Sequence, residues 1–267
     1  NETAMLANYD DENDLFIFRG IPYAKPPVGK LRWKSPDPVG VSTQIDARSY
    51  KPACMQDTYT TEWYHDVIES VGQDKSLFQH VKDVSEDCLY LNIWTSSIDK
   101  NQKKPVMVWV HGGADTGGWS YEPDYLGHKL AKKDVVVVSI GYRLNVFGFF
   151  KHPEMNDETG NFGLEDEILA LKWINDNIEE FGGDPENITY FGESAGGAHV
   201  SYLIASPEAK GLFKRGIIQS GGYNLFKWRS IDDAHELAIR TQNISGTAGL
   251  NDLKSLDENA LLAASRN

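Results

Sequence analysis

The sequence has no apolar run long enough to cross a membrane. No stretch approaches the roughly 18 consecutive apolar residues that a membrane helix needs, so we expect no membrane span. The chain opens at Asn1 with a polar segment, in place of an initiator methionine or a signal peptide. We therefore expect a mature or trimmed product.

Basic residues are also in short supply. The 267 residues include 26 Lys and Arg against 39 Asp and Glu, which gives a net charge of −13. Such an acidic chain repels phosphate backbones and anionic lipids, which argues against nucleic acid and anionic membranes as partners. The charge needs no partner to explain it, because net charge also prevents self-association.

Cysteine is nearly absent, with Cys54 and Cys88 as the two occurrences. The pair can form one disulfide or remain as two buried thiols, and the sequence leaves both open. A disulfide would close a loop of about 35 residues and stabilise the fold by about 3–4 kcal/mol in the chain-entropy model. Three sequons, at Asn1, Asn187 and Asn243, are candidate glycosylation sites and are consistent with secretion.

What the sequence does contain is an alternation of strand-like and helix-like runs. Segments 105–110 and 135–140 are apolar almost throughout, as in parallel strands buried on both faces. Apolar residues recur every three or four positions over 163–178, which predicts an amphipathic helix that 181–185 ends. Similar patterns predict strands at 15–18, 85–94 (Leu89, Leu91 and Ile93 on one face), 188–191 and 216–220 (buried), and helices at 125–132, 195–204 and from about 231.

This alternation is typical of an α/β fold. We find no internal repeat and no linker, so residues 1–267 are expected to form a single domain. The stretch 35–84 is irregular, carries scattered aromatic residues, and is bracketed over most of its length by the two cysteines. We expect it to be a long functional loop or a compact Ω-type unit.

The most informative short motif is Gly192-Glu-Ser-Ala-Gly196, which follows the strand-like run 188–191 and precedes a helical one. A nucleophilic serine must stand clear of its backbone on a tight strand-to-helix turn. Glycines two residues before and after it leave room where a Cβ would collide. The pattern alone is weak, and the alternative is an ordinary exposed serine in a glycine-rich turn.

Longer matches surround this motif. The segment Phe181-Gly-Gly-Asp-Pro-Glu-Asn-Ile-Thr-Tyr-Phe-Gly-Glu-Ser-Ala-Gly-Gly197 resembles the serine signature of type-B carboxylesterases, the cholinesterase and neuroligin family, and Glu86-Asp-Cys-Leu-Tyr-Leu-Asn92 resembles its second signature. Further segments fit the same family in the same order, at 20–24, 26–29, 142–143, 147–149 and 161–166. The resemblance spans about 16–222 and implies an α/β-hydrolase fold, here the N-terminal portion of its central, mostly parallel sheet with flanking helices.

The resemblance implies that Ser194 attacks an ester carbonyl and forms an acyl-enzyme. It also implies an oxyanion hole made by the backbone N–H groups of Gly113, Ala114 and Ala195. The family pattern has a third glycine where this chain has Ala114, and the donor is kept if φ at Ala114 is negative. The phenylalanine usual after the glycines is also missing, and Asp115 stands there.

Two further residues are assigned supporting roles. Glu193 is expected to be a buried, hydrogen-bonded carboxylate beside the turn rather than a direct participant, because a buried carboxylate must be paired. Ser220 resembles the family's support serine, and a plain turn residue is the alternative. We expect no cofactor and no metal.

The triad is incomplete. Its order in this fold is serine, acid, histidine, and in the family the last two lie beyond residue 267. None of the histidines, at 65, 80, 111, 128, 152, 199 and 235, is in the expected position. His199 is about 140° around its helix from Ser194, so we expect a core or surface role, and His235 is expected on the surface. Without a base, serine is a poor nucleophile.

Two explanations follow. The chain is the N-terminal half of a cleaved or two-chain esterase, whose second chain supplies the acid, the histidine and the rest of the sheet, or it is a stand-alone half that hydrolyses nothing. We prefer the first, because the sheet would otherwise end in an unpaired edge with apolar faces.

The predicted function is therefore hydrolysis of a small-molecule carboxylic ester by a secreted serine esterase. One alternative is a cholinesterase-like adhesion or binding protein, although neuroligin-type members usually lose the serine that is Ser194 here. Another is a cholinesterase proper, whose choline-binding tryptophan is replaced by Phe78, which attracts a quaternary ammonium more weakly. Trp63 and Trp119 line a substrate gorge or are packing residues.

Overall fold

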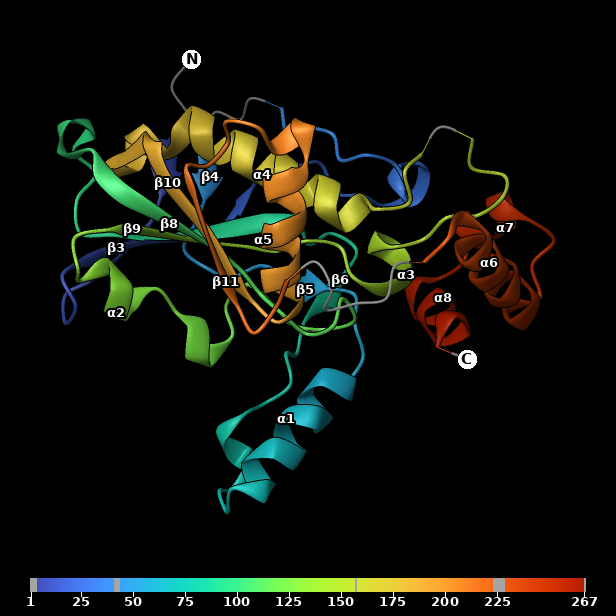
Figure 1. The fold of residues 1–267 in the computed structure, drawn as a ribbon. Helices are drawn as coiled ribbons and strands as arrows, with labels where there is room; N and C mark the ends of the chain where they lie inside the picture. The colour runs from blue at the N-terminus through green and yellow to red at the C-terminus, as the bar shows by residue number, and fades with distance from the viewer. Residues whose placement is uncertain (1–3, 41–43, 157, 223–228, 267) are drawn as a thin grey trace.

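The computed structural model describes residues 4–40, 44–156, 158–222 and 229–266. Seven of the described strands form one sheet through the middle of the protein (Figure 1). In spatial order they are β11 (Arg215–Gln219), β10 (Gly183–Glu193), β8 (Lys104–Val110), β9 (Val136–Ile140), β7 (Tyr90–Thr95), β3 (Leu15–Pro22) and β2 (Asn8–Asp10). Two short pairs lie outside it, β1 (Ala4–Leu6) with β4 (Gln44–Asp46) and β5 (Ala53–Cys54) with β6 (Val84–Ser85).

Some of the helices cover the two faces of the sheet, and the C-terminal ones form a group beside it (Figure 1). The α-helices are α1 (Tyr59–Ser70), α2 (His128–Ala131), α3 (Asn145–Gly148), α4 (Phe162–Asn177), α5 (Ala195–Ala205), α6 (Ile231–Ser245), α7 (Leu250–Lys254) and α8 (Glu258–Ser265). Short 3₁₀ turns are η1 (Gly29–Leu31), η2 (Lys75–Leu77), η3 (Lys100–Gln102), η4 (Pro123–Tyr125), η5 (Ile178–Phe181) and η6 (Pro207–Ala209).

Strands β11, β10, β8 and β9 are parallel, whereas β7, β3 and β2 join them antiparallel. The prediction of an α/β fold with a mostly parallel sheet is confirmed. All five residues of β9 are buried, because α4 and α5 cover one face of the sheet and α2 covers the other. Alternate residues of β9 accordingly enter different clusters, Val138 on the α4 face and Val137 on the α2 face.

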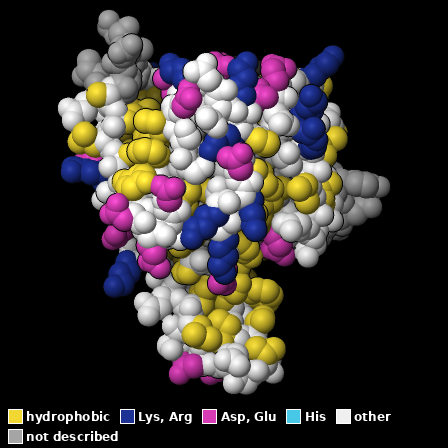
Figure 2. Space-filling view, turned by 90° about the vertical axis from the view of Figure 1, so that its left-hand side faces the viewer, with side chains coloured by type: hydrophobic (Ala, Val, Ile, Leu, Met, Phe, Trp, Pro, Cys, Tyr) yellow, Lys and Arg dark blue, Asp and Glu magenta, His cyan; other side chains and the backbone are white. Residues whose placement is uncertain are grey.

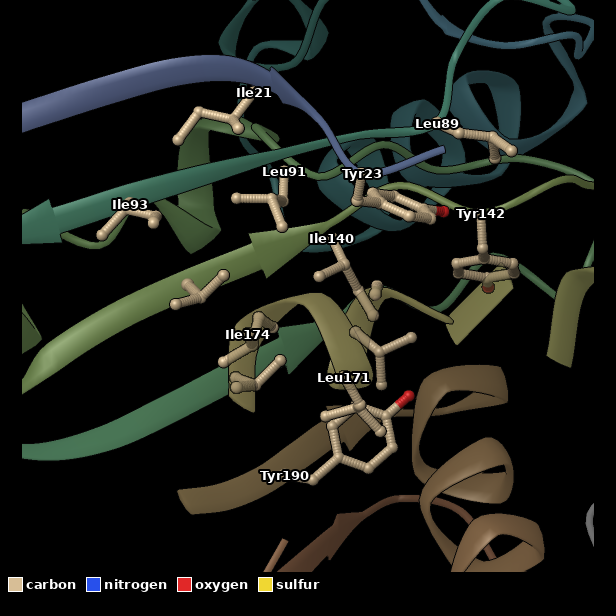
Figure 3. Packing of buried hydrophobic residues seen from close by; sticks show 14 of the residues in the cluster. Ile21, Tyr23, Leu89, Leu91, Ile93, Ile140, Tyr142, Leu171, Ile174 and Tyr190 are labelled. Carbon is tan, nitrogen blue, oxygen red and sulfur yellow. The ribbon is translucent and has the colours of Figure 1, made fainter. Parts of the chain in front are cut away.

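The main core fills the space between the sheet and α4. Leu91 and Ile93 of β7 point toward the same cluster as Leu171 and Ile174 of α4, with Tyr190 of β10 beside them (Figure 3). These side chains are fully buried. The predicted shared face of Leu89, Leu91 and Ile93 is thus confirmed, as is the amphipathic helix.

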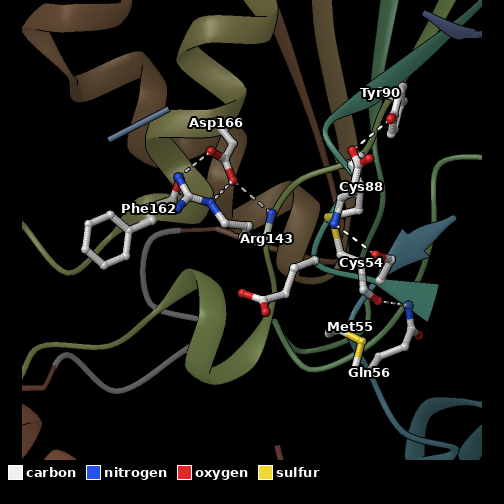
Figure 4. Close-up of a disulfide and its surroundings, with 12 residues drawn as sticks. Cys54, Met55, Gln56, Cys88, Tyr90, Arg143, Phe162 and Asp166 are labelled. Atoms are coloured by element: carbon white, nitrogen blue, oxygen red, sulfur yellow. Dashed lines mark hydrogen bonds and ion pairs between the residues drawn. A yellow bond between two sulfur atoms is a disulfide. The ribbon is translucent and has the colours of Figure 1, made fainter. Parts of the chain in front are cut away.

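The cysteines form a disulfide between β5 and the segment before β7, with Cα atoms 4.9 Å apart. Of the two possibilities that the sequence left open, two buried thiols or one disulfide, the structure has the disulfide. Nearby, Arg143 grips Asp166 with two hydrogen bonds, Nε to Oδ2 at 2.8 Å and Nη2 to Oδ1 at 2.7 Å (Figure 4). This buried bidentate pair holds the segment after β9 against α4.

Three predictions about elements were wrong. The irregular stretch 35–84 contains a twelve-residue helix, α1, which projects from the body (Figure 1). Its inward side buries Thr60 and Thr61 and packs Tyr64 and Ile68 against a small apolar cluster, while Tyr59 and Trp63 are 62% and 54% exposed, so exposed aromatic residues obscure the helical periodicity. Apolar side chains gather on this projection (Figure 2).

The other two wrong predictions concern a strand's burial and a helix's length. β11 was predicted to be buried, but all five of its residues are exposed, because β10 is its single neighbour among the described strands. The helix expected over 125–132 is reduced to α2 after the turn η4. Gly127 lies between them and packs so closely on Trp94 that a Cβ there would be 2.7 Å from its ring.

The candidate glycosylation sites differ in accessibility. Asn1 lies outside the described residues. Asn187 is in β10, and its side-chain oxygen accepts a 2.7 Å hydrogen bond from Arg215. Asn243 is exposed on α6. Over the residues that the structure describes, no helix combines the length and the hydrophobicity that crossing a membrane requires.

Candidate active site

Ser194 lies at the turn where β10 meets α5. Its backbone has φ 53° and ψ −119°, a conformation that L-residues rarely adopt. Strain of this kind costs about 1–3 kcal/mol and persists only where the surroundings impose it. Here the N–H of Ser194 donates to the carbonyl of Gln219 at 2.9 Å, and its own carbonyl accepts from Ala198 at 2.9 Å. The predicted strand–turn–helix setting of the serine is therefore present.

The two glycines that flank Ser194 are required by space. A Cβ at Gly192 would lie 2.6 Å from the carbonyl carbon of Gly196. One at Gly196 would lie 2.3 Å from the carbonyl oxygen of Val110. Real Cβ atoms do not approach backbone atoms so closely, so both positions exclude a side chain unless the backbone moves.

The loop after β8 lies directly against the serine. A Cβ at Gly112 would be 3.1 Å from the Cβ of Ser194. Gly113, with φ 100°, closes the loop on itself: its carbonyl accepts from Thr116 N at 3.0 Å and from Gly117 N at 3.1 Å. The structure thus places the start of this loop, at Gly112, beside Ser194, and the oxyanion-hole role of Gly113 and Ala114 stays a prediction.

Ala114 differs from the expectation. Its φ is +55°, not negative, and the following Asp115 has φ +62°. Both residues occupy the left-handed region that favours glycine. The loop therefore has a backbone conformation suited to glycine, and it is strained because Ala114 and Asp115 carry a Cβ. Ala195, the third predicted donor, is fully buried at the first position of α5, where its N–H has no partner inside the helix.

Glu193 was expected to be buried and hydrogen-bonded, and this prediction was wrong. Its side chain is half-buried, and no described residue forms a hydrogen bond with its carboxylate. Desolvation raises its pKa. The carboxylate faces the glycine loop, since a Cβ at Gly112 would be 3.2 Å from its Oε2.

Ser220 is exposed at the end of β11, in a turn with φ 48°. The next residue, Gly221, packs against Ser194, and a Cβ there would lie 2.6 Å from the Ser194 carbonyl oxygen. Ser220 is therefore beside the site, and its role as a supporting residue stays a prediction.

His199 is fully buried, as one of its two expected roles required. What the sequence did not indicate is its pair of partners. Nδ1 lies 2.6 Å from Oε1 of Glu167 on α4, and Nε2 lies 3.0 Å from Oδ1 of Asp115 in the glycine loop. Burial would lower the pKa of His199, but the charges of Glu167 and Asp115 outweigh burial and raise it to about 10. The two carboxylates thus favour the protonated ring, while burial also raises the pKa of Glu167.

The remaining histidines leave the serine without a base. Across the described residues, no histidine is hydrogen-bonded to the Ser194 hydroxyl. His111 is buried behind the glycine loop, and burial lowers its pKa to about 4. His235, expected on the surface, is half-buried, and its enclosed Nε2 has no hydrogen-bond partner among the residues that the structure describes. The described residues also contain no group of His, Cys, Asp and Glu side chains arranged to hold a metal.

A buried carboxylate beside α1 was missed by sequence reasoning. Glu122 is 2% exposed, accepts from Trp119 N at 3.0 Å, and is 3.4 Å from the hydroxyl of Tyr64. Burial raises its pKa to about 7. No periodicity marks such a residue, because it lies in a turn.

The aromatic residues in question have separate environments. Trp119 is buried, and its ring centroid lies 5.5 Å from that of Phe78. The Phe78 ring is also stacked on the Tyr64 ring, with the centroids 4.2 Å apart. Trp119 is thus a packing residue and the Phe78 ring is covered. Trp63 is exposed on α1.

Comparisons with known proteins agree with this geometry. The sequence model of the carboxylesterase family matches residues 6–261 of this chain. The chain is 39% identical over 251 residues to acetylcholinesterase of Electrophorus electricus, covering 92% of this chain and 38% of that protein. It is 43% identical over 213 residues to para-nitrobenzyl esterase of Bacillus subtilis (strain 168), covering 79% of this chain and 41% of that protein.

Among solved structures, a carboxylesterase of Geobacillus stearothermophilus superposes with a TM-score of 0.83 at 38% identity, covering 98% of this chain and 51% of that one. The chain therefore spans about half of this solved relative and about two fifths of the two curated relatives. The predicted fold is confirmed as that of the carboxylesterases.

Proposed function

This chain belongs to the carboxylesterase family, and from that premise we propose that it is the nucleophile-bearing part of a serine carboxylester hydrolase. The observation that carries the proposal is the position of Ser194, strained at the β10–α5 turn and in contact range of the loop at Gly112. A serine in an ordinary glycine-rich turn needs neither feature.

In the proposed reaction, the Ser194 hydroxyl oxygen attacks the ester carbonyl carbon, and the hydroxyl proton passes to a base. The oxyanion of the tetrahedral intermediate accepts hydrogen bonds from the N–H groups of Gly113 and Ala195. We keep the N–H of Ala114 as the third donor although its φ is positive, because the left-handed backbone there is the conformation that a glycine would adopt. Collapse expels the alcohol, which takes the proton. Water then attacks the acyl-enzyme by the same route and releases the acid.

We assign the base and its acid to the C-terminal half of the fold, as a second chain or as further polypeptide. Two features support this. No described histidine is hydrogen-bonded to Ser194, and β11 exposes one whole edge with Ile217 and Ile218 each 42% exposed. A parallel sheet is normally covered and continued, so this edge is where further strands are expected.

The substrate class that fits is a small carboxylic ester, and the environment that fits is extracellular. The two curated relatives are named acetylcholinesterase and para-nitrobenzyl esterase. The disulfide of Cys54 and Cys88 favours an oxidising compartment, and the exposed Asn243 sequon is consistent with it. Neither the acyl group nor the alcohol follows from these residues.

A non-catalytic binding protein is the second candidate, favoured by the absence of a described base at Ser194. A cholinesterase is less favoured, because Tyr64 and Trp119 cover the Phe78 ring that would face a quaternary ammonium.

The test is covalent labelling of native protein with a fluorophosphonate, followed by intact-mass analysis and peptide mapping. We expect one adduct, on Ser194, together with a co-purifying or contiguous polypeptide that carries a later histidine. Native material that takes no label would exclude the hydrolase and leave the binding protein.

A further inference from the structure

His199 joins three elements at a buried point behind the nucleophile. It lies on α5, five residues after Ser194, and contacts Glu167 of α4 on one side and Asp115 of the glycine loop on the other. Glu167 also accepts a 2.7 Å hydrogen bond from the hydroxyl of Tyr190 on β10. The ring and the Glu167 carboxylate are fully buried, whereas the Asp115 side chain keeps 25% of its exposure.

The contact between His199 and Asp115 is electrostatic. Asp115 Oδ1 is buried and receives no well-directed hydrogen bond from a described residue, yet it lies 3.0 Å from His199 Nε2. A buried carboxylate without a compensating charge is costly. The imidazole cation supplies that charge, so the loop residue is bound to the α5 helix by its side chain.

The loop needs such binding because of its backbone. Ala114 and Asp115 both have positive φ, and a strained conformation of this kind persists only where neighbouring contacts hold it. Other holding contacts are the Asn145 N–H, which donates to the Asp115 carbonyl at 2.6 Å, and Gln56 Oε1, which accepts from Gly118 N at 2.9 Å. His199 is the contact that comes from the nucleophile's own helix.

We propose that His199 is a positioning residue for ester hydrolysis: through Asp115 it holds the strained loop so that the N–H groups of Gly113 and Ala114 stay aimed beside Ser194. This inference rests on the proposed function for its catalytic consequence. It assigns His199 no proton transfer and no contact with substrate. Glu167 fixes the ring from behind, so that one helix carries both the nucleophile and the anchor of the oxyanion loop.

The decisive variant is Asp115→Asn in the full-length protein. Asparagine tolerates positive φ and has the size of aspartate, so the change removes the charge and leaves the backbone conformation accessible. We expect kcat on p-nitrophenyl acetate to fall about 10- to 100-fold, below the loss caused by deleting an oxyanion donor outright, with KM within about twofold. Asp124→Asn, at an exposed carboxylate on η4, is the matched control and should change neither value.

A second variant separates positioning from plain structural support. Ala114→Gly removes the backbone strain at that residue, so adding it to Asp115→Asn should restore kcat by about threefold or more. His199→Gln should lower kcat in the same way, although it leaves two buried carboxylates without a cation and can fail to fold. Rescue by a backbone change at Ala114 is not expected of an ion pair that only stabilises the core.

Hydrogen exchange provides a readout independent of activity. The N–H groups of Thr116 and Gly117 donate to Gly113 within the loop, and that of Gly118 donates to the Gln56 side chain. In Asp115→Asn these three amides should exchange about tenfold faster if His199 holds the loop. Unchanged exchange of these three amides in Asp115→Asn would overturn the proposal, as would an unchanged kcat. A variant Asp115→Asn with a lower melting temperature, whose kcat is not restored by adding Ala114→Gly, would overturn it as well. If wild-type protein takes no fluorophosphonate label, the proposed function fails, and the exchange measurement still decides whether His199 positions the loop.

Discussion

The N–H of Ser194 donates a 2.9 Å hydrogen bond to the carbonyl of Gln219, which ties the nucleophile turn to the last residue of β11. The register pairs Glu193 with Gln219 in the same ladder. β11 is exposed along its length, so the strained turn depends on a strand with one described neighbour. The conformation of the Ser194 turn therefore depends on how the exposed edge of the sheet at β11 is held.

The first prediction concerns that edge. Ile217→Lys places a charge where further strands are proposed to pair, and we expect it to reduce both association with the C-terminal half and fluorophosphonate labelling of Ser194 by about tenfold or more. Ile244→Lys, on α6 and 46% exposed, is the control and should leave both unchanged. Size-exclusion chromatography with intact-mass analysis measures the association. Equal behaviour of the two variants would argue that nothing pairs with β11.

The second prediction concerns Gly196, two residues after Ser194. Gly196→Ala puts a Cβ 2.3 Å from the Val110 carbonyl oxygen, so the turn must open. We expect a loss of about 3 kcal/mol in unfolding free energy and loss of Ser194 labelling, since a backbone atom cannot yield as a side chain does. Gly40→Ala, where a Cβ meets nothing within 4 Å, should be neutral. Urea unfolding of both variants checks this, and a stable, labelled Gly196→Ala would contradict it.

The third prediction concerns the disulfide. Replacing both Cys54 and Cys88 by alanine should lower the free energy of unfolding by about 3–4 kcal/mol, because the unfolded chain regains the freedom that the closed loop denies it. Chemical denaturation of oxidised wild type, reduced wild type and the double variant measures the effect. The double variant should match the reduced protein; a variant as stable as the oxidised protein would show that the link contributes nothing.

The fourth prediction concerns Glu122, whose pKa is raised by burial from 4.5 to about 7. The folded state therefore binds its proton more tightly than the unfolded state does. The stability that this contributes is complete below pH 4.5 and is lost as the pH rises through 7. Glu122→Gln, which carries no charge, should be more stable than wild type above that range by on the order of 3 kcal/mol and nearly equal to it at low pH.

Unfolding free energies of Glu122→Gln and wild type at pH 4 and pH 8 test this, with the exposed Glu208→Gln as a control that should follow wild type at both. Parallel pH dependence of wild type and Glu122→Gln would show that Glu122 is not the titrating group.

Much of the fold followed from local patterns. The runs that became β8 and β9 are apolar because both faces of those strands are covered, and the periodicity of α4 records its single buried side. The turn at Ser194 was predicted because a tight turn leaves no room for a Cβ at Gly192 and Gly196, and this requirement is visible in the sequence as two glycines at fixed spacing around the serine. Helix α1 was missed because it buries the polar Thr60 and Thr61 and exposes Trp63, so the apolar residues that pack inward do not stand out in the sequence.

By itself, the sequence determined the family and the alternation of the main strands and helices, and it singled out Ser194 as the candidate nucleophile, because each of these depends on residues close together in the chain. Tertiary structure alone decided the positive φ of Ala114, the exposure of β11 and the partners of His199. Glu167 and Asp115 are far from His199 in sequence and carry no pattern that links them to it. Only the packing of α4, the glycine loop and α5 around one point brings the three charges together, and that packing is a property of the whole fold.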